Sequence, residues 1–293
     1  MTKVLCIGDI MLDVTAVVGA PIRQGVETRA VISTHGGGAA ANVASWLAVS
    51  GTPSHLIARV GDDAAGQTVI AELHKYGVEH SETIVPGVGT GVVIVLVDAL
   101  GERTMFPDSG ANSGLSLADL PSLDGFTAVY LSGYPLVNPK SRDGALAILH
   151  AVKERGLTVI FDPSTVGVLL EVGLSQVREW LSLVDVVILN EEEAHFLSGK
   201  HNPVEAAADL LELTPLVVIK RGGNGALAQS REAALVQIPA IAVDVVDTTG
   251  AGDAFAAGFI QAWINRNRLL ESLHNGATFA ARCVANVGAR PQI

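Results

Sequence analysis

The stretch VVDTTGAGDAFAAGF, residues 245–259, decides the fold of this chain. The valines at its start, Val243, Val245 and Val246, predict the end of a buried strand. Asp247-Thr248-Thr249 is typical of a turn and a helix N-cap, and Gly250 and Gly252 allow the backbone to come close to a ligand. Apolar residues then recur at helical spacing, at Phe255, Phe259, Ala262 and Trp263. The stretch therefore predicts a strand, a glycine turn and a helix that begins near Gly252.

The start of this helix is a predicted anion site. A helix N-terminus presents unpaired N–H groups and the positive end of the helix dipole, which together bind phosphate or stabilise a developing negative charge. Asp253 lies in the first turn, where the dipole also stabilises a carboxylate, so helix capping alone explains it equally well. The crowding of Asp247, two threonines and two glycines around Asp253 goes beyond what capping requires. We therefore interpret the stretch as a functional site.

Two acids follow the first apolar run of the chain. Residues 3–8, KVLCIG, predict a central parallel strand, and Asp9 and Asp13 lie at or just beyond its carboxyl end. Ligands of open α/β sheets bind at that end. Asp13 is therefore a candidate to hold a substrate hydroxyl, and the alternative is an acid in an exposed loop.

Short apolar runs alternate with helical patterns along the rest of the chain. The runs cover residues 126–131, 157–161, 184–189 and 216–219, and the helical patterns include 62–77, 140–155 and 203–213. This alternation predicts an α/β fold with a central, mostly parallel sheet and helices on both faces. We expect residues 1–293 to form a single domain.

The composition limits the possible partners. The chain is 49% hydrophobic with a formal net charge of −11 and has no cluster of basic residues, which argues against binding of nucleic acid or an anionic membrane. The first residues are too acidic for a signal peptide, and the charge-free residues 30–58 are broken by polar ones. Cys6 and Cys283 form no metal-binding or redox motif. We expect a cytoplasmic protein that acts on small molecules.

Two motifs carry a resemblance to a known family. DTTGAGDAF at 247–255 and GGGAAAN at 36–42 resemble the C-terminal and N-terminal signatures of the ribokinase-like (PfkB) carbohydrate kinases. These enzymes phosphorylate a hydroxyl of a sugar or nucleoside with ATP and Mg²⁺. The resemblance covers the whole chain and implies a small β-sheet lid formed by segments at about 14–34 and 90–107. Apolar residues on more than one face of the lid strands predict a homodimer through the lid.

The resemblance also implies roles for single residues. Asp253 would be the catalytic base, and the amides of Gly250, Ala251 and Gly252 would form the anion hole. The acceptor would be held by Asp13, Gly37, Gly38 and Asn42. On this basis we expect an ATP-dependent phosphotransferase that acts on a hydroxyl of a small sugar.

A second group of residues is expected to serve the nucleotide. Asn190 and Glu193 match the family motif N-x-x-E, which arranges Mg²⁺ through water, although acids at a helix start also simply complement the dipole. Residues 217–228, VVIKRGGNGALA, predict a hairpin, and the resemblance brings Lys220 and the turn from Gly222 to Gly225 close to the ATP phosphates. The helix at 273–285 would cover the adenine.

The resemblance implies a monovalent cation behind the anion hole. Its ligands would be Asp247 and the carbonyls of Thr249 and the Val287-Gly288 turn. Many relatives bind K⁺ at the matching positions.

Other functions remain as alternatives. Gly36, Gly38 and Ala41 loosely fit a dinucleotide fingerprint, but they follow a hairpin-like segment instead of the first strand of a βαβ unit. The chain has no GxxxxGK[ST] phosphate loop. A sugar or nucleotide sensor on the same fold would have no use for a base at Asp253.

The acceptor is the least specified part of the prediction. Where ribokinases carry Asn, Lys and Glu, this chain has Met11, Ala39 and Gly133. These departures weaken the case for ribose and leave fructose, another hexose or a nucleoside open. A phosphorylated acceptor would require basic lid residues, for which the candidates are Arg23, Arg29 and Arg103.

Overall fold

The computed structural model describes residues 2–81 and 83–293. Its large sheet has the strand order β15-β14-β13-β12-β11-β10-β1-β4-β6. In this order, the seven strands from β13 to β6 pair in parallel, whereas β14 and β15 pair antiparallel at the edge next to β13. The bounds are β1 (Lys3–Ile7), β4 (Ser54–Ile57), β6 (Glu79–His80), β10 (Phe126–Ser132), β11 (Thr158–Asp162), β12 (Val186–Asn190), β13 (Leu216–Lys220), β14 (Ala226–Ser230) and β15 (Val236–Ile238).

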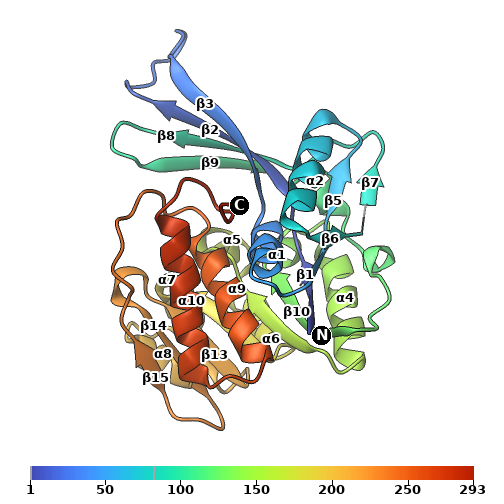
Figure 1. The fold of residues 1–293 in the computed structure, drawn as a ribbon, viewed down its shortest axis with the longest axis vertical. Helices are drawn as coiled ribbons and strands as arrows, with labels where there is room; N and C mark the ends of the chain where they lie inside the picture. Colours follow the sequence, from blue (N-terminus) through green and yellow to red (C-terminus); the bar gives the residue numbers. More distant parts are fainter. Residues whose placement is uncertain (1, 82) are drawn as a thin grey trace.

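Helices cover both faces of this sheet (Figure 1). On one face lie α1 (Ala39–Val49), α2 (Ala64–Tyr76), α9 (Ala251–Ile264) and α10 (Leu269–Val284). On the other lie α4 (Arg142–Glu154), α5 (Val166–Val172), α6 (Leu174–Leu181), α7 (Glu191–Ser198) and α8 (Pro203–Leu210). In β1, Val4 and Cys6 enter the first core while Leu5 and Ile7 enter the second. A strand buried on both faces has to be apolar throughout, which explains the continuous apolar runs.

A second sheet forms a lid. Its strands are β2 (Met11–Val18), β3 (Ala30–Gly37), β8 (Val92–Val97) and β9 (Arg103–Asp108), in the order β3-β2-β8-β9. Because β2 begins just after β1 ends, the lid rises from the carboxyl end of the central strands (Figure 1). A small pair, β5 (Arg59–Gly61) and β7 (Thr83–Val85), lies near its base, and α3 (Tyr134–Val137) follows β10.

The predicted fold class is confirmed, with the parallel sheet, helices on both faces and lid in place. The hairpin predicted at 217–228 is also present, since β13 and β14 pair antiparallel around a 3-10 turn at Gly222–Asn224. Within the described part of the chain, no helix is long and apolar enough to cross a membrane.

The buried strand predicted to end at Val243, Val245 and Val246 is wrong. Residues 239–250 form no strand, and the side chains of Val245 and Val246 are 63% and 61% exposed. The amides of Val246 and Asp247 donate to the carbonyl of Val284 at the end of α10 instead of pairing in the sheet. The valines therefore line a cavity, and helix α9 begins at Ala251, one residue before the predicted start.

Candidate active site

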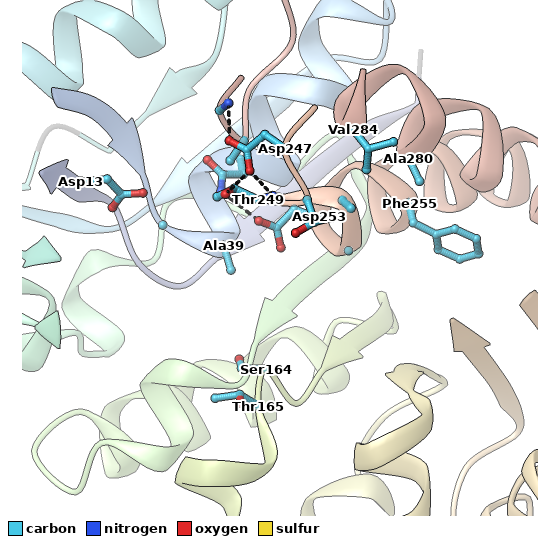
Figure 2. A pocket seen from close by; sticks show the side chains of 18 of the residues that line it. Asp13, Ala39, Ser164, Thr165, Asp247, Thr249, Asp253, Phe255, Ala280 and Val284 are labelled. Atoms are coloured by element: carbon cyan, nitrogen blue, oxygen red, sulfur yellow. Dashed lines mark hydrogen bonds between the residues drawn. The ribbon is translucent and has the colours of Figure 1, made fainter. Parts of the chain in front are cut away.

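A cavity of about 1430 Å³ lies between the lid and the carboxyl ends of the parallel strands. Most of the residues predicted for the acceptor, the base and the nucleotide line it. Figure 2 shows Asp13, Asp247, Thr249 and Asp253 on one side, with Ser164 and Thr165 across from them. The structure therefore brings together Asp13 and Asp253, which are 240 positions apart in the sequence.

Asp253 lies in the first turn of α9 and contacts α1. The amide Nδ2 of Asn42 donates to its Oδ2 at 2.8 Å. Burial raises the pKa of Asp253 to about 7, and the nearby carboxylates of Asp162 and Asp9 act in the same direction. The hydrogen bond from Asn42 and the charge of Lys220 oppose this shift. An acid with a pKa near neutrality is suited to general-base catalysis.

The orientation of the Asn42 amide is fixed by Arg290, which the sequence analysis did not identify. The guanidinium donates from Nε to Asn42 Oδ1 at 3.3 Å and from Nη2 to the Gly37 carbonyl at 3.1 Å. Its Nη1 lies 3.3 Å from Glu72 Oε1. Because a guanidinium offers only donors, the Asn42 oxygen has to face Arg290 and its nitrogen has to face Asp253. The side chain of Arg290 is only 4% exposed, so this is a buried network.

Asp13 projects from β2 onto the glycine motif. A Cβ at Gly37 would lie 2.3 Å from both carboxylate oxygens of Asp13, so a side chain at this position would displace that carboxylate. Burial raises the pKa of Asp13 to about 7, Arg290 lowers it, and Asp9 and Glu72 raise it further. Gly38 has a φ of 95° and begins α1, with the Asp9 carbonyl where its Cβ would be.

Asp9 supports the acceptor side of the cavity, although the sequence analysis gave it no role. Its buried carboxylate accepts hydrogen bonds from the backbone of Ala39 and Ala40 and from Ser132 Oγ, the last at 3.2 Å. Burial raises its pKa. Asp9 therefore caps α1, and its position directly after a parallel strand was the signal that could have identified it.

The glycine turn before α9 lies next to a buried ion pair. Gly250 has a φ of 74°, and a Cβ at Gly252 would lie 3.3 Å from the Lys220 ammonium. Lys220 Nζ is 2.7 Å from Asp162 Oδ2. Burial alone lowers the pKa of Lys220, but Asp162 and Glu193 raise it above its usual value. The amides of the helix start and the ammonium therefore create one positive region, which favours an anion there.

Asn190 and Glu193 form a capping box at the start of α7. Asn190 donates from its backbone N and Nδ2 to the two oxygens of Glu193, at 2.8 and 2.7 Å, and Glu193 N donates to Asn190 Oδ1 at 2.8 Å. Burial raises the pKa of Glu193 to about 8, and Asp162 adds to the effect. The local role is therefore helix capping. Both carboxylate oxygens of Glu193 already accept hydrogen bonds, so the residue would contact a Mg²⁺ ion through the waters of that ion and not directly. Its role in metal binding stays a prediction.

The predicted cation ligand Asp247 accepts hydrogen bonds from other residues of this chain. Asp247 Oδ1 accepts from Thr249 N at 2.8 Å, Thr249 Oγ1 at 2.6 Å and Arg103 Nη2, and Oδ2 accepts from Gly288 N at 3.0 Å. Burial alone would raise the pKa of Asp247, but these hydrogen bonds lower it to about 2. The Cys283 thiol lies 3.3 Å from the Thr249 carbonyl. A cation at this place stays a prediction.

Two positions that depart from the family pattern, Gly133 and Met11, have well-defined surroundings. A Cβ at Gly133 would lie 2.2 Å from the Pro163 carbonyl, so no acidic side chain fits at that position. Asn112 lies next to Met11 and binds the backbone of Ile10, accepting from its N at 3.3 Å and donating to its O at 2.8 Å. This buried amide, whose stretch Gly110-Ala111-Asn112 resembles ribokinases in sequence, fixes the connection between β1 and β2.

The comparisons with known proteins identify the family of the chain. All of the chain, residues 1–293, matches the model of the pfkB family carbohydrate kinases. The chain belongs to this family. This PfkB-family protein is 31% identical to the ATP-dependent ribose-1-phosphate kinase of Halopiger xanaduensis over 293 residues, which cover 99% of the chain and 94% of that protein.

Two further relatives bear on acceptor and nucleotide. A fructokinase of Klebsiella pneumoniae is 33% identical over 232 residues, covering 76% of this chain and 75% of its own. A putative ribokinase II from E. coli, solved with ATP and Mg²⁺, superimposes with a TM-score of 0.87 at 25% identity, covering 99% of this chain and 94% of its own. The protein is therefore an ATP-dependent sugar or nucleoside kinase, a phosphotransferase with an alcohol group as acceptor.

Proposed function

We propose that this PfkB-family kinase transfers a phosphoryl group from ATP to a hydroxyl of a small, uncharged sugar, as a fructokinase or ribokinase does. The observation that carries the proposal is the pair of Asp13 and Asp253 facing one cavity, with an anion site beside Asp253. Asp13 and Asn42 bind acceptor hydroxyls, and Gly37 and Gly38 give them access. Asp253 accepts the proton of the attacking hydroxyl.

Phosphoryl transfer depends mainly on positioning and on charge stabilisation. The amides of Gly250, Ala251 and Gly252 and the ammonium of Lys220 supply positive charge on one side of Asp253. The turn from Gly222 to Gly225 also lines the cavity and serves the nucleotide phosphates. Asn190 and Glu193 would hold a Mg²⁺ ion through its waters, and the ion would neutralise charge on the phosphates.

The charges of the cavity favour an uncharged acceptor. Among the described residues that line it, the cations are Arg103 and Lys220, and each is paired with an aspartate. Arg23 and Arg29 are exposed and do not line the cavity. Asp9 and Asp13 add negative charge at the acceptor side. A phosphate on the acceptor would therefore meet Asp9 and Asp13 without an unpaired lysine or arginine, and His35 is the one further basic side chain among the described lining residues.

A nucleoside is the second candidate acceptor. Val93, Val95 and Met105 of the lid line the cavity with apolar side chains, a surface on which a nucleobase can pack. The non-enzymatic alternative is a sensor that binds a sugar or nucleotide without catalysis, and the proposed general base Asp253 argues against it.

Assembly and location are also proposals. Ile32, Ile94 and Phe106 are exposed on the face of the lid opposite the cavity residues Ser33, Val95 and Met105, which supports a homodimer through the lid. Cys6 and Cys283 are buried free thiols, in keeping with a single domain that works in the reducing cytoplasm.

The test is ATP consumption over a panel of acceptors. The panel contains fructose, ribose, other hexoses and nucleosides, with ribose-1-phosphate and fructose-6-phosphate as charged comparisons. We expect turnover with an uncharged sugar and a higher KM in Asp13→Asn. Preference for a phosphorylated acceptor would overturn the uncharged class. Binding of acceptor or ATP without turnover of any panel member would make the protein a sensor.

A further inference from the structure

Arg103 is the cavity cation that the proposed function leaves without a role. It is the first residue of β9 in the lid, and its guanidinium donates from Nη1 to Thr249 Oγ1 and from Nη2 to Asp247 Oδ1. Asp247 and Thr249 belong to the turn that leads into α9. The contact therefore joins the lid to the residues immediately before the Gly250–Gly252 amides.

The Asp247 carboxylate and the Thr249 carbonyl are poorly suited to a metal ion while Arg103 is in place. K⁺ requires several oxygen atoms with free lone pairs. Here Asp247 Oδ1 already accepts from Arg103 and from the backbone and hydroxyl of Thr249, and Oδ2 accepts from Gly288 N. The Thr249 carbonyl faces the Cys283 thiol. The positive charge beside the carboxylate is a guanidinium from this chain.

We propose that Arg103 takes the place of the monovalent cation in this kinase, so that lid closure, and not a bound ion, sets the geometry of the anion site. The inference rests on the proposed function. Arg103 is a positioning residue, since it contacts Asp247 and Thr249 and acts on the amides through them.

The geometry of a guanidinium suits this task. Its planar fork holds two oxygens at once, which fixes the Thr249 side chain relative to the Asp247 carboxylate. The next residue, Gly250, has a φ of 74°, and as a glycine it does not restrict its own backbone conformation. The orientation of the turn is therefore set by its neighbours. These are Asp247, Thr249 and Ala289, and Gly250 packs against Ala289.

One consequence follows for the order of events. The contact exists only while β9 lies over the turn, and the same position of the lid encloses the acceptor cavity. A single ion pair therefore links exclusion of water from the acceptor to completion of the anion site.

The first experiment compares initial rates in potassium chloride and in N-methylglucamine chloride. Wild type is expected to run at the same rate in both salts. Arg103→Gln should lose about ten- to hundredfold in kcat, since two charge-assisted hydrogen bonds are lost. Methylguanidinium or K⁺ should restore part of this loss, because each supplies a cation to the freed carboxylate. Arg103→Lys should lie between the two, and Arg23→Gln, an exposed lid arginine, should match wild type.

A second readout does not depend on turnover. The melting temperature of the nucleotide-free protein is measured in the same two salts. We expect no difference for wild type and an increase in K⁺ for Arg103→Gln, because the uncovered Asp247 then binds the ion. A wild-type rate or melting temperature that rises strongly with K⁺ would overturn the inference and support the family's cation. A wild-type rate in Arg103→Gln would also overturn it. If no acceptor is phosphorylated, the proposed function fails while the melting data still decide the role of Arg103.

Discussion

Asp253 is held by two opposing environments. Burial and the neighbouring carboxylates favour the protonated form and raise its pKa, whereas the hydrogen bond from Asn42 and the charge of Lys220 favour the ionised form. Burial has the larger effect and distinguishes Asp253 from an ordinary N-terminal helix acid. The sequence placed the residue correctly at a helix start, but the surroundings that raise its pKa come from distant segments, among them α1 and Asp162.

The first prediction concerns Asp253→Asn. The amide keeps the size of the side chain but cannot accept the proton, so kcat should fall by at least about 10² with little change in KM. A variant that keeps more than about a tenth of wild-type kcat with chemistry rate-limiting would leave helix capping as the role of Asp253.

The same substitution should affect stability in a pH-dependent way. The folded pKa of Asp253 is raised to about 7, above the unfolded value, so its ionisation destabilises the fold as pH rises through that interval. Asp253→Asn should therefore melt close to wild type at about pH 4 and above it at about pH 8. Equal melting temperatures at both values would show that the carboxylate is well solvated.

The second prediction concerns the pH profile. Asp13 and Asp253 both have a pKa raised to about 7, and both act as carboxylates in the proposed reaction. The value of kcat/KM should rise with pH through this region, and its apparent pKa values belong to the pair. Asp13→Asn should leave a single titration in the residual activity. A flat wild-type profile between about pH 5 and about pH 8 would contradict both assignments.

The third prediction concerns Arg290. Arg290→Lys keeps the charge beside Glu72, but one ammonium cannot reproduce the three directions of the guanidinium. Asn42 should then lose its fixed orientation, and kcat should fall about tenfold with a shifted pH profile, since Asn42 tunes Asp253. Arg268→Lys, at the exposed start of α10, is the matched control. A fall in melting temperature with an unchanged pH profile would make Arg290 purely structural.

At the scale of elements, the prediction from sequence succeeded where one pattern dominated. The runs at 126–131 and 216–219 became β10 and β13 because strands covered on both faces have to be continuously apolar. It failed at Val243, Val245 and Val246, which form a similar apolar run but follow the last strand, β15, and belong to no sheet. The sequence of an apolar run does not show whether the run faces a core or a ligand cavity. That is decided by the segments, distant in sequence, that pack around it.

The packing of α9 on α10 supplies the fourth prediction. A Cβ at Gly258 would lie 2.6 Å from the Asn275 carbonyl and 3.0 Å from the Gly276 Cα, so the two backbones meet at glycines. Gly258→Ala should lower the free energy of unfolding by about 1–3 kcal/mol, measured in urea. Gly167→Ala in α5, where nothing lies within 4 Å of the added atom, should be neutral or stabilising. An equal change in the free energy of unfolding for the two variants would contradict close packing of α9 on α10 at Gly258.

At the scale of the molecule, the lid is the surface that a single chain leaves uncovered. The fifth prediction is that light scattering at micromolar protein gives a dimer and that Ile94→Lys, on the outer lid face, gives a monomer. Leu170→Lys, at an exposed leucine of α5, controls for the added charge and should leave the mass unchanged. A monomeric wild type would contradict the lid interface.

The order of strands in the large sheet has a consequence for synthesis. The strands β1, β4 and β10 and the whole lid come from residues 3–132, whereas α9 and α10, which cover the same face as α1, come from residues 251–284. On the ribosome, the half that holds the acceptor can assemble while the cover of α1 is still inside the tunnel. Until α9 emerges, the side of α1 that packs on it stays uncovered, and the nascent chain is a substrate for chaperones.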